Sequence, residues 1–116
     1  MDSVCEPEAA VERLGGDLQL YRELVQSFLD DSAGLLPRLA SALAAGDCDG
    51  VHRAAHCLKG TAATCGAIAV ADVCAKLERS ALERDLGNGR ERLDELQSRM
   101  REAAGRLAAY YVPVKE

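Results

Sequence analysis

The chain has 116 residues, the size of one ordinary domain, and carries a formal net charge of −5. Hydrophobic residues make up 48% and charged residues 28%, a composition that excludes an intrinsically disordered chain. The acidic balance disfavours nonspecific binding to nucleic acid or anionic lipid, and no segment has the roughly 20 apolar residues of a membrane-spanning helix. We therefore expect a single domain over residues 1–116 that binds no nucleic acid and does not insert into membranes.

The first residues of the chain lack the basic start and the apolar run of a secretory signal peptide. The five cysteines form no Cys-x-x-Cys pair, which favours reduced thiols, several of them packing as small core residues. Cys57 and Cys65 in particular are expected to be packing residues. Both features predict a cytoplasmic protein.

The chain begins with a short predicted helix over residues 7–14, closed by Gly15 and Gly16. Asp17 can cap a long helix that follows. Its apolar residues recur at steps of three and four and form one stripe: Leu18, Tyr21, Leu24, Val25, Phe28, Leu29, Leu35, Leu36, Leu39 and Leu43. Pro37 predicts a kink near Ala33 and Gly34 with continuation afterwards, and Gly46 predicts the end of the helix.

Three further helices are predicted over about residues 49–65, 67–86 and 90–110, with Asp47 or Asp49 capping the first of them. Glycines separate them, at position 66 and in the run 87–89. Aromatic residues supply only 3% of the chain, so Ala, Leu and Val must build the core, as suits close-packed helices. The sequence therefore predicts an all-α protein, an antiparallel four-helix bundle over about residues 17–111 with a short extra N-terminal helix.

The predicted helix over residues 49–65 has two chemically distinct faces. An advance of about 100° per residue gathers its core residues on one side, namely Val51, Ala54, Leu58, Thr61, Ala62 and Cys65. His56 points about 160° away from Leu58, toward solvent. His52, Lys59, Gly60 and Ala63 share the side of His56.

The surroundings of His56 are unusual for a solvated helix face. Gly60 in the middle of a helix costs about 1 kcal/mol relative to alanine. The neighbours Ala55, Gly60 and Ala63 are small where Glu, Lys or Gln is common. Such a clearing lets another protein approach the imidazole, which is a competent nucleophile near neutral pH. Lys59, one turn on, could neutralise an anion attached to the ring.

The run from Ala55 to Ala67 resembles the signature of histidine-containing phosphotransfer (HPt) domains, Ala-His-x-Leu-Lys-Gly-Ser/Thr-Ala followed by Gly-Ala. The resemblance extends over most of the chain. It includes Leu20-Tyr21-Arg22-Glu23-Leu24 before the signature, Ala44-Ala45-Gly46-Asp47 in the usual linker, and Leu77-Glu78 in the helix after the histidine.

The resemblance implies a phosphorelay intermediate in a bacterial two-component system. The matching histidine, His56, would carry a phosphoryl group between receiver-domain aspartates, and Lys59 would screen its charge. Gly60 and Gly66 would allow close docking and helix packing. Glu78 stands where family members often have a glutamine that hydrogen-bonds the imidazole or the phosphoryl group, and a carboxylate there would orient the ring but repel a phosphate.

The same resemblance implies the partners and cofactors. Receiver domains of response regulators, a hybrid sensor histidine kinase, or both would dock on a surface formed by His52, Ala55, Gly60 and Ala63, with Glu78 behind it. The chain has no glycine-rich nucleotide loop and no evident acidic triad for Mg²⁺. We therefore expect a phosphocarrier and not an enzyme, with no cofactor or metal of its own, whose receiver partner supplies Mg²⁺ and the aspartate.

Two alternatives remain open at the level of sequence. Cys48, His52 and His56 recur at i, i+4 and i+8, and two histidines four residues apart can bind zinc on one helical face. No third ligand is evident, and Lys59 would oppose a cation. In the second alternative, the chain is a non-phosphorylated adaptor that only sequesters a receiver.

Overall fold

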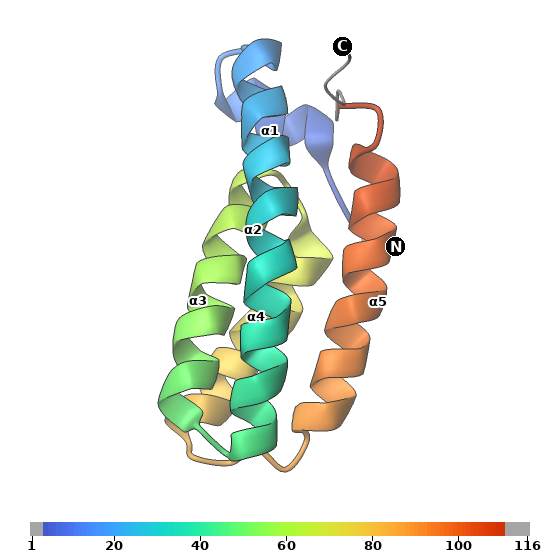
Figure 1. Cartoon of the computed structure of the whole chain (residues 1–116). Coiled ribbons are helices and arrows are strands. Elements are labelled where there is room, and N and C mark those ends of the chain that lie inside the picture. The colour runs from blue at the N-terminus through green and yellow to red at the C-terminus, as the bar shows by residue number, and fades with distance from the viewer. Residues whose placement is uncertain (1–3, 111–116) are drawn as a thin grey trace.

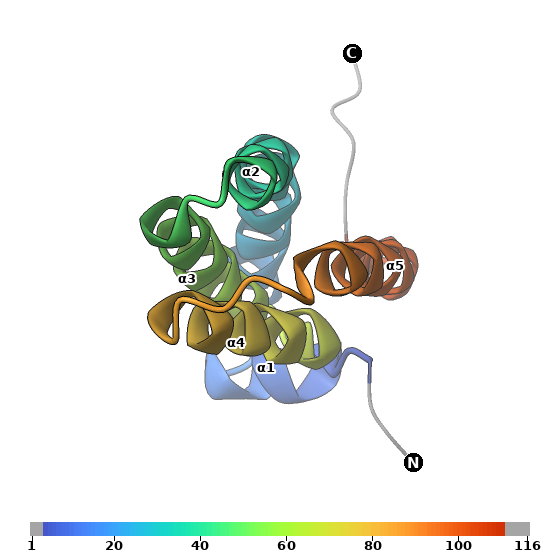
Figure 2. The same cartoon turned by 90° about the horizontal axis from the view of Figure 1, so that it is seen from below.

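The structure is a computed structural model that describes residues 4–110, and within that range it contains five α-helices and no strand. They are α1 (Pro7–Arg13), α2 (Leu18–Ala45), α3 (Cys48–Thr64), α4 (Ile68–Leu82) and α5 (Gly89–Leu107). The four long helices run alternately up and down, and α1 lies at one end of them (Figure 1). Seen end-on, α2, α3, α4 and α5 stand around a common centre in chain order (Figure 2). The predicted all-α antiparallel bundle is confirmed.

The predicted caps at both ends of α2 and at the start of α3 are confirmed. The side chain of Asp17 accepts a hydrogen bond from the Leu20 N–H at the start of α2, at 3.0 Å. Gly46 ends α2 in the left-handed conformation, with φ 67°. Asp47, one of the two residues proposed as the cap of α3, accepts from the Gly50 N–H at 3.0 Å. Helix α2 passes through Pro37 without interruption.

The core lies between the apolar faces of the four long helices. Its largest fully buried side chains are Tyr21, Phe28, Leu39, Leu58, Leu77, Leu96 and Leu107. Leu18, expected on the buried stripe of α2, is exposed. It is the first residue of α2, at the end of the helix, where the neighbouring helices of the described chain do not cover it fully. Thr61, expected in the core, is only half-buried. No helix within residues 4–110 has the length and apolarity needed to cross a membrane.

Two predicted helices end earlier in the structure than the periodicity indicated. Helix α4 stops at Leu82 and not at residue 86, because Arg84 takes φ 58° and the Asp85 N–H turns back to the Ser80 carbonyl at 2.9 Å. Leu86 still packs against the core, but from the turn. Helix α5 ends at Leu107 and not at residue 110. Position 111, the expected end of the bundle, lies outside the described residues.

All five cysteines lie in the described part of the chain, and all are free thiols. Cys5, Cys65 and Cys74 are buried as small core residues, and Cys48 is half-buried. Cys57 is exposed, so its predicted role as a packing residue is wrong. It follows His56 on the outer side of α3, which the bundle leaves uncovered.

The turn between α3 and α4 is held by a group of residues that we call the N-terminal junction: Glu6, Tyr21, Cys65, Gly66 and Tyr110. The Glu6 N–H donates to the Gly66 carbonyl at 2.8 Å, and the Tyr21 hydroxyl donates to the Cys65 carbonyl at 2.6 Å. The ring of Tyr110 meets Tyr21 edge-on, with 5.1 Å between ring centroids. The junction therefore ties the segment before α1, the start of α2 and the end of α5 to one turn.

Candidate functional site

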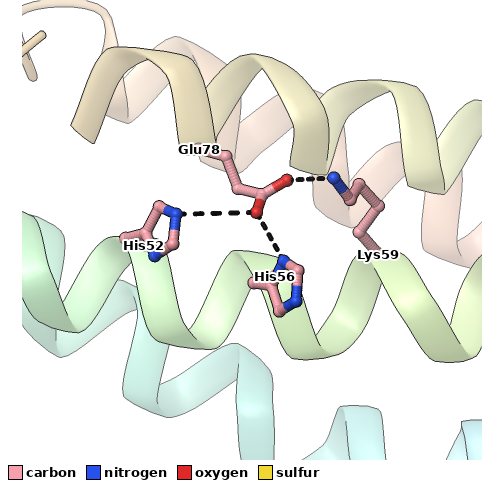
Figure 3. Close-up of polar contacts among 4 residues, drawn as sticks. All are labelled: His52, His56, Lys59 and Glu78. Atoms are coloured by element: carbon pink, nitrogen blue, oxygen red, sulfur yellow. Dashed lines mark hydrogen bonds and ion pairs between the residues drawn. The ribbon is translucent and has the colours of Figure 1, made fainter. Parts of the chain in front are cut away.

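Helices α3 and α4 bring together four polar side chains that we call the His56 site: His52, His56, Lys59 and Glu78 (Figure 3). The first three lie on one face of α3, spaced by one turn each, and Glu78 reaches toward them from α4. Its Oε2 lies 2.7 Å from His56 Nδ1, and its Oε1 lies 2.5 Å from Lys59 Nζ. The site is thus a carboxylate held between donors of the neighbouring helix.

The two partners of the shortest histidine contact differ sharply in exposure. The His56 side chain is 68% exposed, whereas that of Glu78 is 11% exposed. Since an ionised carboxylate can only accept hydrogen bonds, Nδ1 of His56 must carry the hydrogen in this contact. The neutral ring then has its lone pair on Nε2, which points away from Glu78 (Figure 3). The predicted solvent-facing imidazole is confirmed.

Glu78 is ionised at neutral pH in this environment. Burial alone would raise the pKa of its carboxyl group, but hydrogen bonds from Lys59 and His56, together with the positive charge of Lys59, lower the pKa below its ordinary value of 4.5. The residue is therefore a buried negative charge with two donors aimed at it. This satisfies the requirement that a buried charge be paired and hydrogen-bonded.

His52 lies one turn before His56 and faces the same carboxylate. Its Nε2 is 3.8 Å from Glu78 Oε2, and its ring is nearly parallel to that of His56, with 6.0 Å between centroids and 7° between planes. The His52 side chain is 38% exposed. It lies at the edge of the His56 site, on the same side of the helix as His56, as predicted.

Lys59, predicted to screen the charge of a phosphoryl group on His56, is itself paired in the structure. Its side chain is 37% exposed, and its ammonium is bound by Glu78. The pairing joins residues that lie 19 positions apart on different helices, and no local pattern in the sequence indicates it. Lys59 therefore holds Glu78 in place as well as lying one turn from His56.

The small residues around His56 divide into exposed and buried ones. Gly60 and Ala63 are exposed, as predicted, and a Cβ atom added at Gly60 would meet nothing within 4 Å. Ala55 is fully buried, so its predicted place on the docking surface is wrong. Because α3 is covered on both flanks, by α2 and by α4, its buried arc is wider than the apolar stripe suggested.

An open hollow of about 740 Å³ between α2 and α3 extends to Cys57, the residue after His56. Arg38 from α2 and Arg53 from α3 line it, together with the small residues Ser41, Ala45 and Gly50. The helical periodicity of the sequence does not predict this hollow. The hollow forms where α2 packs against α3. The small residues at three- and four-residue spacing on α2 are the sequence feature that could have indicated it.

The metal-binding alternative finds no support in the geometry. Among residues 4–110 there is no group of three or more His, Cys, Asp or Glu side chains that could hold a metal ion. His52 and His56 face the carboxylate of Glu78, and the same carboxylate is ion-paired with Lys59, whose positive charge would repel a metal ion.

A helical bundle that presents an exposed, carboxylate-bound histidine with a lysine one turn on defines the class of histidine phosphotransfer domains. The family model described as the Hpt domain matches residues 23–109, and the chain belongs to this family. The crystal structure of histidine-containing phosphotransfer protein B (HptB) from Pseudomonas aeruginosa PAO1 is similar, with a TM-score of 0.76 and 25% sequence identity over 85% of this chain and 86% of that one. A comparison with curated proteins gives no match.

Membership of the family defines the general function of the chain, which is histidine phosphotransfer in a phosphorelay. Hpt domains interact with the receiver domains and kinases of such relays. The chain is accordingly a phosphocarrier and not an enzyme in its own right.

Proposed function

We propose that His56 is the phosphoacceptor and that Nε2 is the atom that carries the phosphoryl group. The observation that carries this assignment is the contact between His56 Nδ1 and the buried carboxylate of Glu78, at 2.7 Å. It directs the Nε2 lone pair outward from a side chain that is 68% exposed. No other histidine of the chain combines such exposure with a hydrogen-bonded ring.

In the proposed reaction, His56 Nε2 attacks the phosphorus of an aspartyl phosphate on a receiver domain. The new N–P bond forms as the P–O bond to the aspartate breaks, and the aspartate leaves as a carboxylate. The transferred group bears negative charge, which the ammonium of Lys59, one turn from His56, would partly offset. The second transfer reverses these steps on another receiver.

We assign the Mg²⁺ of the reaction and the aspartate to the receiver partner, and no cofactor to this chain. Hard divalent cations take several oxygen ligands, whereas the one carboxylate of the His56 site already binds Lys59 and His56. The partners would be receiver domains of response regulators, a hybrid sensor histidine kinase, or both, in the cytoplasm of a bacterium.

Docking would use the outer side of α3. Gly60 needs no special backbone conformation, and a Cβ atom added to it would meet nothing within 4 Å, so its lack of a side chain serves an approaching partner rather than the bundle. Ala63 and the exposed edge of His52 continue this surface along the helix.

The test is phosphotransfer from a labelled, phosphorylated receiver in the presence of Mg²⁺. We expect the wild-type chain to acquire an acid-labile, base-stable label and His56→Gln to acquire none. His52→Gln, which removes the other imidazole of α3, should still become labelled. An unlabelled wild type with several competent receivers would contradict the assignment, and partner regulation that persists in His56→Gln would favour a non-phosphorylated adaptor instead.

A further inference from the structure

We propose that Glu78 keeps Nδ1 of His56 protonated after the phosphoryl group is attached, so that the carrier holds a charge-balanced phosphoimidazolium that transfers readily. The inference rests on the proposed function of His56 and concerns what happens after the first transfer. Glu78 acts here as a positioning residue, because it acts through the imidazole and not on the phosphoryl group.

The geometry supplies a fixed acceptor for that proton. Glu78 is anchored on α4 and nearly buried, and Lys59 holds its other oxygen at 2.5 Å. The exposed ring of His56 can therefore gain a group at Nε2 without any rearrangement of the carboxylate at Nδ1. Attachment at Nε2 occurs on the side of the ring that faces away from Glu78 (Figure 3).

The chemistry requires the proton to stay in place. When Nε2 shares its lone pair with phosphorus and no proton leaves Nδ1, the ring acquires one positive charge, which lies against the negative charge of Glu78. In the reverse direction, the N–P bond breaks with its electron pair returning to Nε2, and neutral imidazole leaves. Without the Nδ1 proton the leaving group would be an imidazolate anion, which is a far stronger base and a poorer leaving group.

A glutamine at this position could accept the same hydrogen bond but has no charge to offset the imidazolium. Hydrogen bonds to charged groups contribute roughly twice as much as neutral ones. The carboxylate therefore favours a form of phosphohistidine that is ready to transfer, and a carboxamide favours a form that is stored for longer.

Among the described residues, only a few titratable groups face the His56 site and could contribute to the pH dependence of phosphotransfer. From α3 these are His52 and Lys59, and from α4 they are Glu78 and the thiol of Cys74. Burial raises the pKa of Cys74 to about 12, so its thiol does not ionise near neutral pH. Lys59 is ion-paired with Glu78. His52 faces the same carboxylate, with its Nε2 3.8 Å from Glu78 Oε2, and is therefore tested separately.

The experiment compares wild type and Glu78→Gln after labelling His56 with phosphoramidate. Single-turnover transfer to a receiver is measured from about pH 6 to about pH 9. We expect a nearly flat rate for the wild type, and for Glu78→Gln a rate that falls as the pH rises, to about tenfold below the wild type at the upper end. Spontaneous hydrolysis of the phosphohistidine should slow in parallel. Nitrogen-15 spectra of the phosphorylated wild type should show a protonated Nδ1.

Glu83→Gln, which neutralises an exposed carboxylate just beyond α4, is the matched control and should keep the wild-type profile. Coincident pH profiles for wild type and Glu78→Gln, or an unprotonated Nδ1 in the phosphorylated wild type, would overturn the inference. So would a flat profile that is lost in His52→Gln but kept in Glu78→Gln. If Glu78→Gln does not fold, the wild-type nitrogen-15 spectrum still decides. A wild type that is never labelled at His56 would instead refute the proposed function.

Discussion

The His56 site and the N-terminal junction both depend on α3 and the turn after it. Each contains a glycine, Gly60 in the first and Gly66 in the second, and the two glycines differ in their surroundings. A Cβ atom added at Gly60 would meet nothing within 4 Å, whereas one added at Gly66 would lie 2.6 Å from the Glu6 carbonyl oxygen. Gly66 also has φ 80°, in the region that favours glycine. One short motif therefore contains a glycine that the fold requires and a glycine that the fold does not use.

The largest expected effect is that of Gly66→Ala. The added methyl group must displace the Glu6 carbonyl, and alanine must also adopt a positive φ. We expect a loss of about 3 kcal/mol in the free energy of unfolding, measured by urea denaturation. Gly46→Ala is the matched control, because Gly46 has a similar φ of 67° but open space around it, and it should lose about 1–2 kcal/mol. Equal losses in the two variants would show that the contact with Glu6 is unimportant.

Tyr21→Phe should have the next largest effect on stability. It removes the hydroxyl that donates to the Cys65 carbonyl at 2.6 Å and leaves that buried acceptor with one partner fewer. We expect a loss of about 1–2 kcal/mol in the free energy of unfolding, with helical content unchanged. Tyr110→Phe removes a hydroxyl at the exposed contact with Glu8, at 3.3 Å, and should change stability by less than about 0.5 kcal/mol. If both variants behave alike, the junction does not depend on the Tyr21 hydrogen bond.

Gly60→Ala should have the smallest effect on stability and the opposite sign. Alanine in an open helix interior should stabilise the bundle by about 0.5–1 kcal/mol, while the methyl group slows phosphotransfer from a receiver and Gly60→Leu slows it further. Gly105→Ala, at a similarly open position in α5, should gain stability without any change in transfer. Destabilisation by Gly60→Ala, or transfer at the wild-type rate in Gly60→Leu, would contradict a docking role for Gly60.

The amino-acid sequence by itself determined the helices and the exposed position of His56. Helical periodicity and caps such as Asp17 depend on residues within one or two turns of each other, so the sequence records them directly. The exposure of His56 follows from the same local geometry, since it lies opposite Leu58 on the helix. The motif around His56 indicated the family, which the match over residues 23–109 confirms.

Only the tertiary structure decided which side chains surround that histidine. The contact between His56 and Glu78 spans 22 positions and depends on how far α4 slides along α3, which the packing of both helices sets and neither helix encodes alone. The same packing buried Ala55 and bound Lys59 to Glu78. The early end of α4 likewise depends on the left-handed conformation of Arg84, a residue type that carries no turn signal. Local periodicity describes one helix at a time, whereas a site between helices is fixed by their relative positions.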